Sequence, residues 1–320
     1  MSILVFVEGS GSEIKKSSKE AITYAFETGK ITGENEVIAL VLGNYSNEEL
    51  ENLGKNGASR VINMSDEKLN NNQIGAFSDI IENIVQSRSV SLILMTKSSF
   101  SDNVGARVAG KIGASIVSNI TSLPDTSSGF SVRKSIFTGK AFATVSMSGE
   151  MKVLIIKRNT IELLERDAKA IVERIPIPNN ISFAEIITGD EKAEGDILLD
   201  DAEIVVSGGR GLKGPENWGM IEDLAKALGA ATGCSKPVSD LGWRPHHEHV
   251  GQTGVKVSPN LYIAIGISGA IQHLAGVNSS KVLVAINKDE DAPFFKAADY
   301  GIIGDAFEVV PRLTKKVKSL

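Results

Sequence analysis

Hydrophobic and polar positions alternate along the first part of the chain in blocks that predict strands and helices in turn. Short, almost uninterrupted apolar runs are typical of strands that are buried on both faces of a parallel sheet. Between them, apolar residues recur every three or four positions, which favours amphipathic helices. The pattern therefore predicts a mostly parallel α/β sheet covered on both faces. The expected strands are residues 3–7, 36–42, 60–63 and 91–96, and the expected helices are residues 14–28, 47–56, 77–87 and 102–113.

The pattern then changes to short β-rich runs with glycines between or beside them, at residues 130–135, 136–146 and 152–157. We interpret these as strands joined by tight connections and added to the edge of the first sheet. From about residue 176 to 197 the apolar periodicity disappears and charged residues are dense, which is typical of a linker. We therefore expect a first domain at residues 1–190, the end of a linker at 191–202, and a second domain at 203–320.

The second domain again alternates apolar runs with amphipathic stretches. This alternation predicts a doubly wound parallel sheet, so the whole chain is expected to be a two-domain α/β protein. The expected strands are residues 204–207, 261–267, 281–286 and a run within 298–305, and the expected helices are residues 217–228, 270–275 and 308–320.

Two glycine-rich loops follow strands of the second domain, at residues 207–211 (Ser-Gly-Gly-Arg-Gly) and 266–270 (Gly-Ile-Ser-Gly-Ala). Bare backbone N–H groups near a helix start favour a phosphate or pyrophosphate. Two such loops suggest a nucleotide-type ligand held across the ends of the strands. The alternative is a pair of tight turns that need glycine for their backbone angles. Arg210 favours the first interpretation, because a cation on such a loop meets an anion or an aromatic face.

Two further polar features adjoin these loops. Residues 250–254 (Val-Gly-Gln-Thr-Gly) offer an amide and a hydroxyl between glycines, which suits the edge of a heteroaromatic ring and equally suits a polar hairpin turn. His273 follows the second loop, where its position favours a ligand role over the commoner structural one.

A second group of histidines, at 246, 247 and 249, surrounds Glu248. Histidine and glutamate side chains are common metal ligands, but the sequence shows no second pair of ligands at a suitable spacing. We therefore interpret the run as a solvated loop and expect no metal.

Composition and charge exclude several classes of protein function. The 320 residues are 42% hydrophobic and 23% charged, as in ordinary globular proteins, and the net charge of −5 gives no electrostatic reason to bind nucleic acid. The one cysteine, Cys234, excludes an internal disulfide and indicates a reducing compartment; we interpret it as a small buried residue and not a nucleophile. The chain shows no basic leader and no run of about 18 apolar residues, so we expect a cytoplasmic protein without membrane insertion. No catalytic triad or paired carboxylate is evident, so no catalytic residue is predicted.

Five segments of the second domain, taken together, resemble the α subunit of electron-transfer flavoproteins. They are residues 205–213, 250–254, 261–276, 284–289 and 298–305. The resemblance implies FAD as the cofactor, held between the C-terminal domain and a β subunit in a heterodimer. It also implies an electron carrier and not an enzyme. Electrons would come from dehydrogenases such as those that oxidise acyl-CoA, and would pass to a quinone reductase or another acceptor.

The resemblance implies a role for several residues around the flavin ring. Arg210 would lie against the flavin or its phosphates, and Ser235 and Lys236 would lie at the isoalloxazine ring. Gln252 and Thr253 would reach the ring edge, with the threonine hydroxyl near N5. The family commonly has arginine where this chain has Lys236, which keeps the charge but loses the planar guanidinium.

The remaining implied contacts follow the cofactor toward its adenosine end. Residues 268–273 would hold the pyrophosphate and ribityl chain, with His273 near the flavin N1 and C2 carbonyl. Asn287, Asp305 and Ala306 would hold the adenosine. The full set of expected FAD-binding residues is Arg210, Ser235, Lys236, Val250, Gly251, Gln252, Thr253, Ser268, Gly269, Ala270, Ile271, Gln272, His273, Asn287, Asp305 and Ala306.

Two alternatives remain at this point. One is the electron-bifurcating branch of the same family. The other is a self-sufficient NAD- or FAD-dependent oxidoreductase, which is disfavoured because no proton-transfer pair accompanies the cofactor loops.

Overall fold

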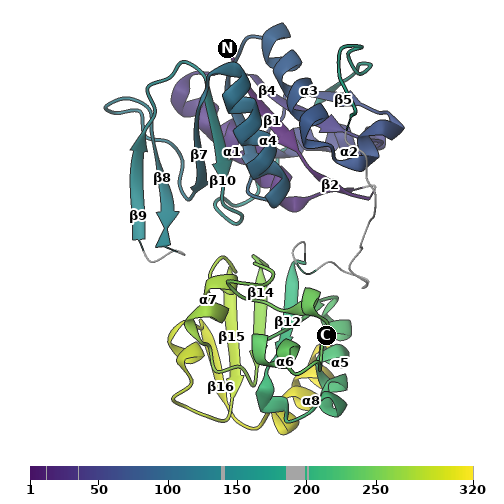
Figure 1. The fold of residues 1–320 in the computed structure, drawn as a ribbon, viewed down its shortest axis with the longest axis vertical. Coiled ribbons are helices and arrows are strands. Elements are labelled where there is room, and N and C mark those ends of the chain that lie inside the picture. The colour runs from purple at the N-terminus through teal and green to yellow at the C-terminus, as the bar shows by residue number, and fades with distance from the viewer. Residues whose placement is uncertain (12, 35, 138–140, 185–198, 200–201, 320) are drawn as a thin grey trace. The chain divides into compact units, whose positions relative to one another are not determined.

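The chain forms two compact units, Met1–Asp190 and Glu191–Leu320, which Figure 1 shows as a purple-to-teal and a green-to-yellow body. This computed structural model describes all residues except 12, 35, 138–140, 185–198, 200, 201 and 320. Most of the expected linker end at 191–202 therefore lies outside the described residues. Each unit is described below by itself.

Unit 1 is built around a sheet of nine strands among the described residues, in the order β11-β5-β4-β1-β6-β10-β7-β8-β9. The strands from β11 to β7 are parallel, and β8 and β9 form an antiparallel hairpin at one end of the sheet (Figure 1). The strands are β1 (Ser2–Val7), β4 (Glu36–Leu42), β5 (Arg60–Met64), β6 (Val90–Thr96), β7 (Ser115–Ile120), β8 (Ser131–Ile136), β9 (Ala141–Ser146), β10 (Lys152–Ile156) and β11 (Ile171–Arg174), with a separate short pair, β2 (Gly9–Ser10) and β3 (Glu13–Ile14).

Helices cover both faces of this sheet, because its central strands are apolar on both sides. On β1, Ile3 and Val5 join the core beneath α1, whereas Leu4 and Phe6 join the core beneath α3 and α4. The expected mostly parallel α/β sheet with added strands is confirmed. The helices are α1 (Lys16–Thr32), α2 (Asn47–Asn52), α3 (Ile74–Ser87) and α4 (Ser99–Ile112), with 3₁₀ turns η1 (Leu53–Asn56) and η2 (Glu67–Asn71).

One expectation for the added strands is wrong. Strand β10 lies between β6 and β7 near the middle of the sheet, parallel to both, and not at its edge. Its residues from Val153 to Ile156 are all buried, and such an uninterrupted apolar run suits a central strand. Strands β7 and β11 were not expected, because their polar and half-exposed residues give no clear period.

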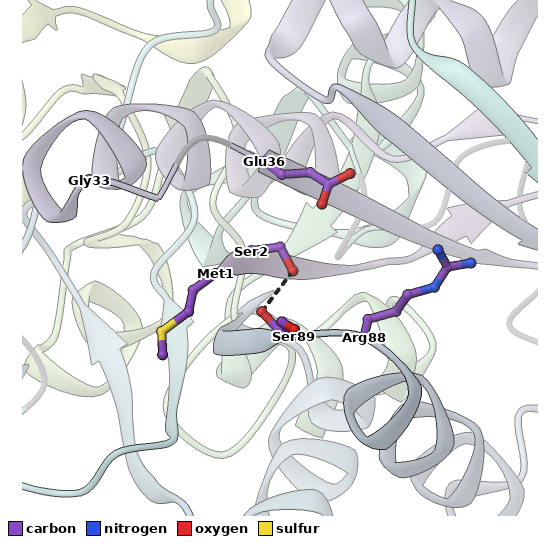
Figure 2. Close-up of a pocket in the computed structure, with 6 residues that line it drawn as sticks. All are labelled: Met1, Ser2, Gly33, Glu36, Arg88 and Ser89. Atoms are coloured by element: carbon purple, nitrogen blue, oxygen red, sulfur yellow. Dashed lines mark hydrogen bonds between the residues drawn. The ribbon is translucent and has the colours of Figure 1, made fainter.

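Unit 1 also carries a surface pocket of about 360 Å³ at the amino ends of β1, β4 and β6 (Figure 2). Its Arg88 guanidinium already pairs with Glu173 at 2.6 Å, and the Ser2 hydroxyl donates to the Ser89 carbonyl at 3.3 Å. None of the expected FAD-binding residues lines this pocket. Its lining residues are Met1, Ser2, Gly33, Glu36, Arg88 and Ser89.

Unit 2 is an entirely parallel sheet of five strands among the described residues, in the order β13-β12-β14-β15-β16. One core lies beneath α5 and α8, and a second lies on the opposite face around Tyr262 and Phe294, so the expected doubly wound parallel sheet is confirmed. The strands are β12 (Ile204–Gly208), β13 (Ala231–Cys234), β14 (Leu261–Ile265), β15 (Val282–Asn287) and β16 (Tyr300–Ile303). The helices are α5 (Gly219–Leu228), α6 (Lys236–Asp240), α7 (Ile271–Val277) and α8 (Ala306–Val317), with 3₁₀ turns η4 (Arg210–Leu212), η5 (Pro215–Asn217), η6 (His246–Glu248) and η7 (Pro293–Lys296).

The strand order of unit 2 contains a switch point. From β12 the chain goes to β13 on one side, and it then returns to β14 on the other side of β12. Connections on the two sides of such a point leave a crevice at the carboxyl ends of the strands, where ligands of open α/β sheets bind. No helix among the described residues has both the length and the apolar character needed to cross a membrane.

Candidate functional site

The topology brings the expected cofactor residues to the carboxyl edge of the unit 2 sheet. The registers align Gly208 with Cys234 on one side and with Ile265 on the other, and Ile265 with Ile286. Asn287, at the end of β15, is aligned with Ile303 of β16. The ends of the five strands and the segments that follow them therefore lie side by side, and they contain every residue of the expected set except residues 250–253, which reach the same edge by another path.

The two glycine-rich loops contact each other directly. The N–H of Gly209 donates to the Ile265 carbonyl at 2.8 Å, and the N–H of Gly211 donates to the Gly266 carbonyl at 3.1 Å. A Cβ at position 209 would lie 2.2 Å from the Gly266 carbonyl oxygen, so only glycine fits there. Close approach of the two backbones thus explains these glycines without a ligand.

The helix expected at residues 217–228 is confirmed as α5, which begins at Gly219. A three-residue 3₁₀ turn, and not this helix, directly follows Gly209. The second loop leads to α7, which has seven residues. Regular helix starts therefore contribute less to this edge than the sequence pattern predicts, and the backbone and side chains of the loops contribute more.

Residues 250–254 reach the edge from the side of β13. The N–H of Val250 donates to the Cys234 carbonyl at 2.9 Å, and the N–H of Gln252 donates to the Gln272 carbonyl at 2.7 Å. The segment is a tight turn stretched between the end of β13 and α7. Its backbone is fixed by these bonds, and the side chains of Gln252 and Thr253 are exposed at its tip.

The expected residues divide into a buried floor and an exposed rim. Ser235, Val250, Gly251, Gly269, His273 and Ala306 are buried, and Asn287 and Asp305 are partly buried. The rim offers hydrogen-bond donors and two cations to solvent. Its exposed residues are Arg210, Lys236, Gln252, Thr253, Ser268, Ala270, Ile271 and Gln272.

His273 is the most constrained polar residue of the floor. Its Nε2 lies 2.9 Å from the Tyr262 hydroxyl, whereas its buried Nδ1 makes no hydrogen bond within the described part of the chain. Burial, with a smaller effect of nearby His249, lowers the pKa of His273 from 6.5 to about 4, and the backbone of Val250 opposes this shift. His273 is therefore neutral at neutral pH and keeps one ring nitrogen available to a ligand.

The interpretation of the second histidine group as a solvated loop is wrong for two of its members. His249 is 2% exposed and Glu248 is 8% exposed, while His246 and His247 lie at the surface. The reason is an ion pair: Nε and Nη2 of Arg244 donate to the two Glu248 carboxylate oxygens at 2.9 and 2.5 Å. This bond anchors the segment that leads into residues 250–254.

Hydrogen bonding and burial shift the pKa values of the groups around this anchor. The hydrogen bond to Glu248 raises the pKa of Arg244, whose guanidinium lies over the Trp218 ring. Burial lowers the pKa of His249, and the charge of Lys236 adds to this effect. The described residues contain no group of three or more His, Cys, Asp and Glu side chains arranged to hold a metal.

Cys234 behaves as a small core residue. It is fully buried, and burial raises the pKa of its thiol to about 12. Lys236, the cation two positions further along the chain, directs its ammonium to Asp240 at 2.9 Å. The interpretation of Cys234 as a buried residue is confirmed.

Asn287 and Asp305 already have structural partners. The amide of Asn287 donates to the Ile267 carbonyl at 3.1 Å, and its oxygen accepts from the Asp289 N–H at 3.1 Å. The Asp305 carboxylate caps α8 by accepting from the Phe307 N–H at 2.9 Å. These bonds fix the loops after β15 and β16, and the adenosine contacts of both residues stay predictions.

The residues present at this edge fit a flavin dinucleotide. The Nδ1 atoms of His249 and His273 are buried and lack a partner among the described residues, and such atoms normally have one. The exposed Arg210 and Ser268 offer a cation and a hydroxyl to a pyrophosphate, and the exposed amide of Gln252 suits a heteroaromatic edge.

Three residues that support this site were not predicted from the sequence, namely Tyr262, Arg244 and Glu248. Tyr262 precedes His273 by eleven positions within an otherwise aliphatic strand, so a polar tip in a buried run was the available signal. Arg244 and Glu248 are four positions apart, a spacing that allows a salt bridge within one turn of chain.

Comparison with known proteins agrees with this geometry. Residues 3–179 match the model of the electron transfer flavoprotein domain, and residues 198–278 match the model of the electron transfer flavoprotein FAD-binding domain. The second match supports FAD as the cofactor, as predicted. It includes the loops after β12, β13 and β14 and ends before Asn287.

Full-length relatives point the same way. The chain is 34% identical to the electron transfer flavoprotein subunit alpha of Bacillus subtilis, over 99% of this chain and 98% of the relative. It is 38% identical to the probable mitochondrial electron transfer flavoprotein subunit alpha of Caenorhabditis elegans, over 98% and 92%. The subunit alpha of Mycobacterium leprae is 33% identical, over 99% and 98%.

The contact between the two glycine-rich loops can be tested by adding one methyl group. Gly209→Ala should lower the free energy of unfolding of unit 2 by about 1–3 kcal/mol, because the new Cβ meets the Gly266 backbone. Both tryptophans, Trp218 and Trp243, lie in unit 2, so their fluorescence during urea unfolding reports on this unit. The control is Gly219→Ala, where a Cβ meets nothing within 4 Å. Equal effects of the two variants would contradict the proposed contact.

The buried state of His273 predicts a pH dependence. Between about pH 6.5 and 4 the unfolded chain binds one proton more than the folded chain at this residue, so stability falls as the pH is lowered. The loss approaches about 3 kcal/mol at the acid end. Urea unfolding at several pH values should show a shallower acid slope for His273→Asn than for the wild type. The exposed control, His247→Asn, should keep the wild-type slope of unfolding free energy against pH. If the slope for His273→Asn is as steep as that of the wild type, the lowered pKa of His273 is contradicted.

Proposed function

The chain belongs to the electron transfer flavoprotein family, and we propose that it is the α subunit of a heterodimeric carrier that holds FAD together with a β subunit. The observation that carries this proposal is the carboxyl edge of unit 2, where two glycine-rich loops in direct backbone contact adjoin exposed donors and cations. This edge lies within the segment that matches the FAD-binding domain of the family. The names of the relatives, which call them subunit alpha, support a second kind of subunit as partner.

We assign the residues of this edge to parts of the cofactor. We assign the pyrophosphate to the two glycine-rich loops, where Ser268 is exposed beside the buried Gly209 and Gly269. Gln252 and Thr253 face the edge of the flavin ring, and Arg210 supplies a cation. FAD, when bound, supplies the reversible uptake of electrons.

The charge balance of the site supports electron carriage. Reduction adds negative charge to a flavin, and nearby donors and cations stabilise such charge and raise the potential. His273 is held as a neutral group on the floor, and Arg210 and Lys236 lie on the rim. None of these groups needs to change its protonation for this role.

The exposed rim supports a shared site. Gln252, Thr253 and Gln272 present their side chains to solvent in the single chain, so a ligand lying on them keeps an open face. A β subunit would cover that face. We propose dehydrogenases, such as those acting on acyl-CoA, as electron donors and a quinone reductase as the acceptor; an accessible ring edge rather than a substrate pocket suits exchange with such proteins.

Co-expression tests the proposed function. The chain should purify with little or no flavin alone, and with about one FAD per heterodimer when it is produced with a β subunit from the same genome. Absorption spectra and release of the cofactor by heat identify and quantify FAD. Reduction by a dehydrogenase and reoxidation by a quinone reductase should follow. A colourless heterodimer, or a lone chain that binds flavin and turns over a small substrate, would contradict the proposal.

Lys236 offers a test of charge at the ring. Arginine at this position keeps the cation and adds a planar group that stacks on aromatic rings. Lys236→Arg should therefore raise the two-electron potential of bound FAD by about 10–30 mV, equivalent to at most about 1.4 kcal/mol. Spectroscopic redox titration measures the shift. The control is Lys226→Arg on α5, the same exchange in the last turn of that helix. If both variants match the wild type, position 236 does not tune the flavin.

A further inference from the structure

Tyr262 is held rigidly beneath the proposed flavin site. It is fully buried in β14, with Val205 of β12 and Leu283 of β15 beside it in the sheet. Its ring stacks parallel to that of Phe294, with 6.4 Å between the centroids. The hydroxyl therefore has one fixed direction, and it meets Nε2 of His273 at 2.9 Å.

Both members of this pair are neutral. Burial raises the pKa of Tyr262, so the phenol keeps its proton. Burial lowers the pKa of His273, so the imidazole carries a single proton. One hydrogen lies between the phenol oxygen and Nε2. If it is bonded to the phenol, the single imidazole proton is on Nδ1; if it is bonded to Nε2, Nδ1 carries no proton.

The surrounding groups decide whether this hydrogen is bonded to the phenol or to Nε2. The Ser207 hydroxyl, on the neighbouring strand β12, makes no hydrogen bond within the described part of the chain, so it gives the phenol no acceptor. The phenol has one hydrogen-bond partner there, Nε2 of His273, so its buried O–H has an acceptor only by donating to Nε2. The imidazole proton then belongs on Nδ1.

The other side of the imidazole is left for a ligand. Nδ1 makes no hydrogen bond within the described part of the chain, so a proton there has no acceptor until a ligand supplies one. The remaining groups around the ring are Phe294, 5.9 Å away between centroids, and His249, which acts through its charge only when protonated.

We propose that Tyr262 is a positioning residue for the flavin site, because its phenol donates to Nε2 and holds His273 as the neutral Nδ1–H tautomer. The inference rests on the proposed function of unit 2 as an FAD-binding domain. In this arrangement His273 is a hydrogen-bond donor toward negative charge without carrying a positive charge of its own. An N–H fixed in place needs no proton uptake when charge appears on the ligand.

Removing only the phenol oxygen isolates this role. In Tyr262→Phe the aromatic ring and its stacking remain, whereas Nε2 loses its partner and the tautomer is no longer fixed. Reduced FAD should then bind roughly two- to tenfold more weakly relative to oxidised FAD, the effect of one hydrogen bond. The measured potential falls accordingly, while the affinity for oxidised FAD changes less.

Tyr24→Phe is a matched control. Tyr24 is also fully buried, and its hydroxyl donates to the Ser122 carbonyl at 2.7 Å, within unit 1. The control therefore loses a buried phenol hydrogen bond of the same kind. It should affect stability similarly and leave the flavin potential unchanged.

The tautomer itself can be observed in the FAD-loaded heterodimer. Only this chain is labelled with ¹⁵N-histidine, and long-range ¹H–¹⁵N NMR spectra distinguish a protonated Nδ1 from a protonated Nε2. The chain has four histidines, and the His273→Asn spectrum identifies the signals of His273. The expected result is a protonated Nδ1 in the wild type and in Tyr24→Phe, and a mixture of tautomers in Tyr262→Phe.

Several outcomes overturn the proposal. A wild-type spectrum with the proton on Nε2 refutes it, even if Tyr262→Phe fails to fold. A Tyr262→Phe heterodimer with the wild-type tautomer and potential refutes it as well. Failure of the proposed function is seen separately, as a wild-type heterodimer without FAD, and the spectrum of the free labelled chain then still decides the tautomer.

Discussion

Direct contact between two backbones is the constraint on which unit 2 depends. At the switch point of the sheet, the Gly209 N–H donates to the Ile265 carbonyl and the Gly211 N–H donates to that of Gly266. Side chains at these positions would hold the loops apart. The glycines thus allow the loops after β12 and β14 to meet at the switch point, which is where open α/β sheets bind dinucleotides.

Buried polar groups then place the side chains around these loops. The Arg244–Glu248 ion pair fixes the entry to residues 250–254, and the Tyr262 hydroxyl fixes the ring of His273. Both are costly to bury unless their partners are in place, because a buried charge or donor without a partner loses its hydration. The same bonds therefore shape the segment that presents Gln252 to solvent.

The sequence predicts most of the strands of unit 2, because an apolar run that ends in glycine consists of residues adjacent in the sequence. With the strands it also predicts that the glycine loops lie at one edge of the sheet. It also predicts His273 as the histidine beside that edge. It does not predict that His249 and Glu248 are buried, since the Glu248 carboxylate is held by Arg244, whose guanidinium in turn lies over the Trp218 ring. Nor does it place β10 in the middle of the first sheet, because strand order is set by pairing between distant segments. Local pattern thus predicts the elements and candidate loops, whereas tertiary contacts decide which polar residues lie beneath the site.

The central claim is that the glycine-lined carboxyl edge of unit 2 binds FAD. A crystal structure of the heterodimer with its cofactor tests this claim most directly. The account predicts the pyrophosphate against the loops at Gly209 and Ser268, and the flavin ring within hydrogen-bonding distance of Gln252 and Thr253. A flavin bound elsewhere, with this edge covered by protein alone, would contradict it.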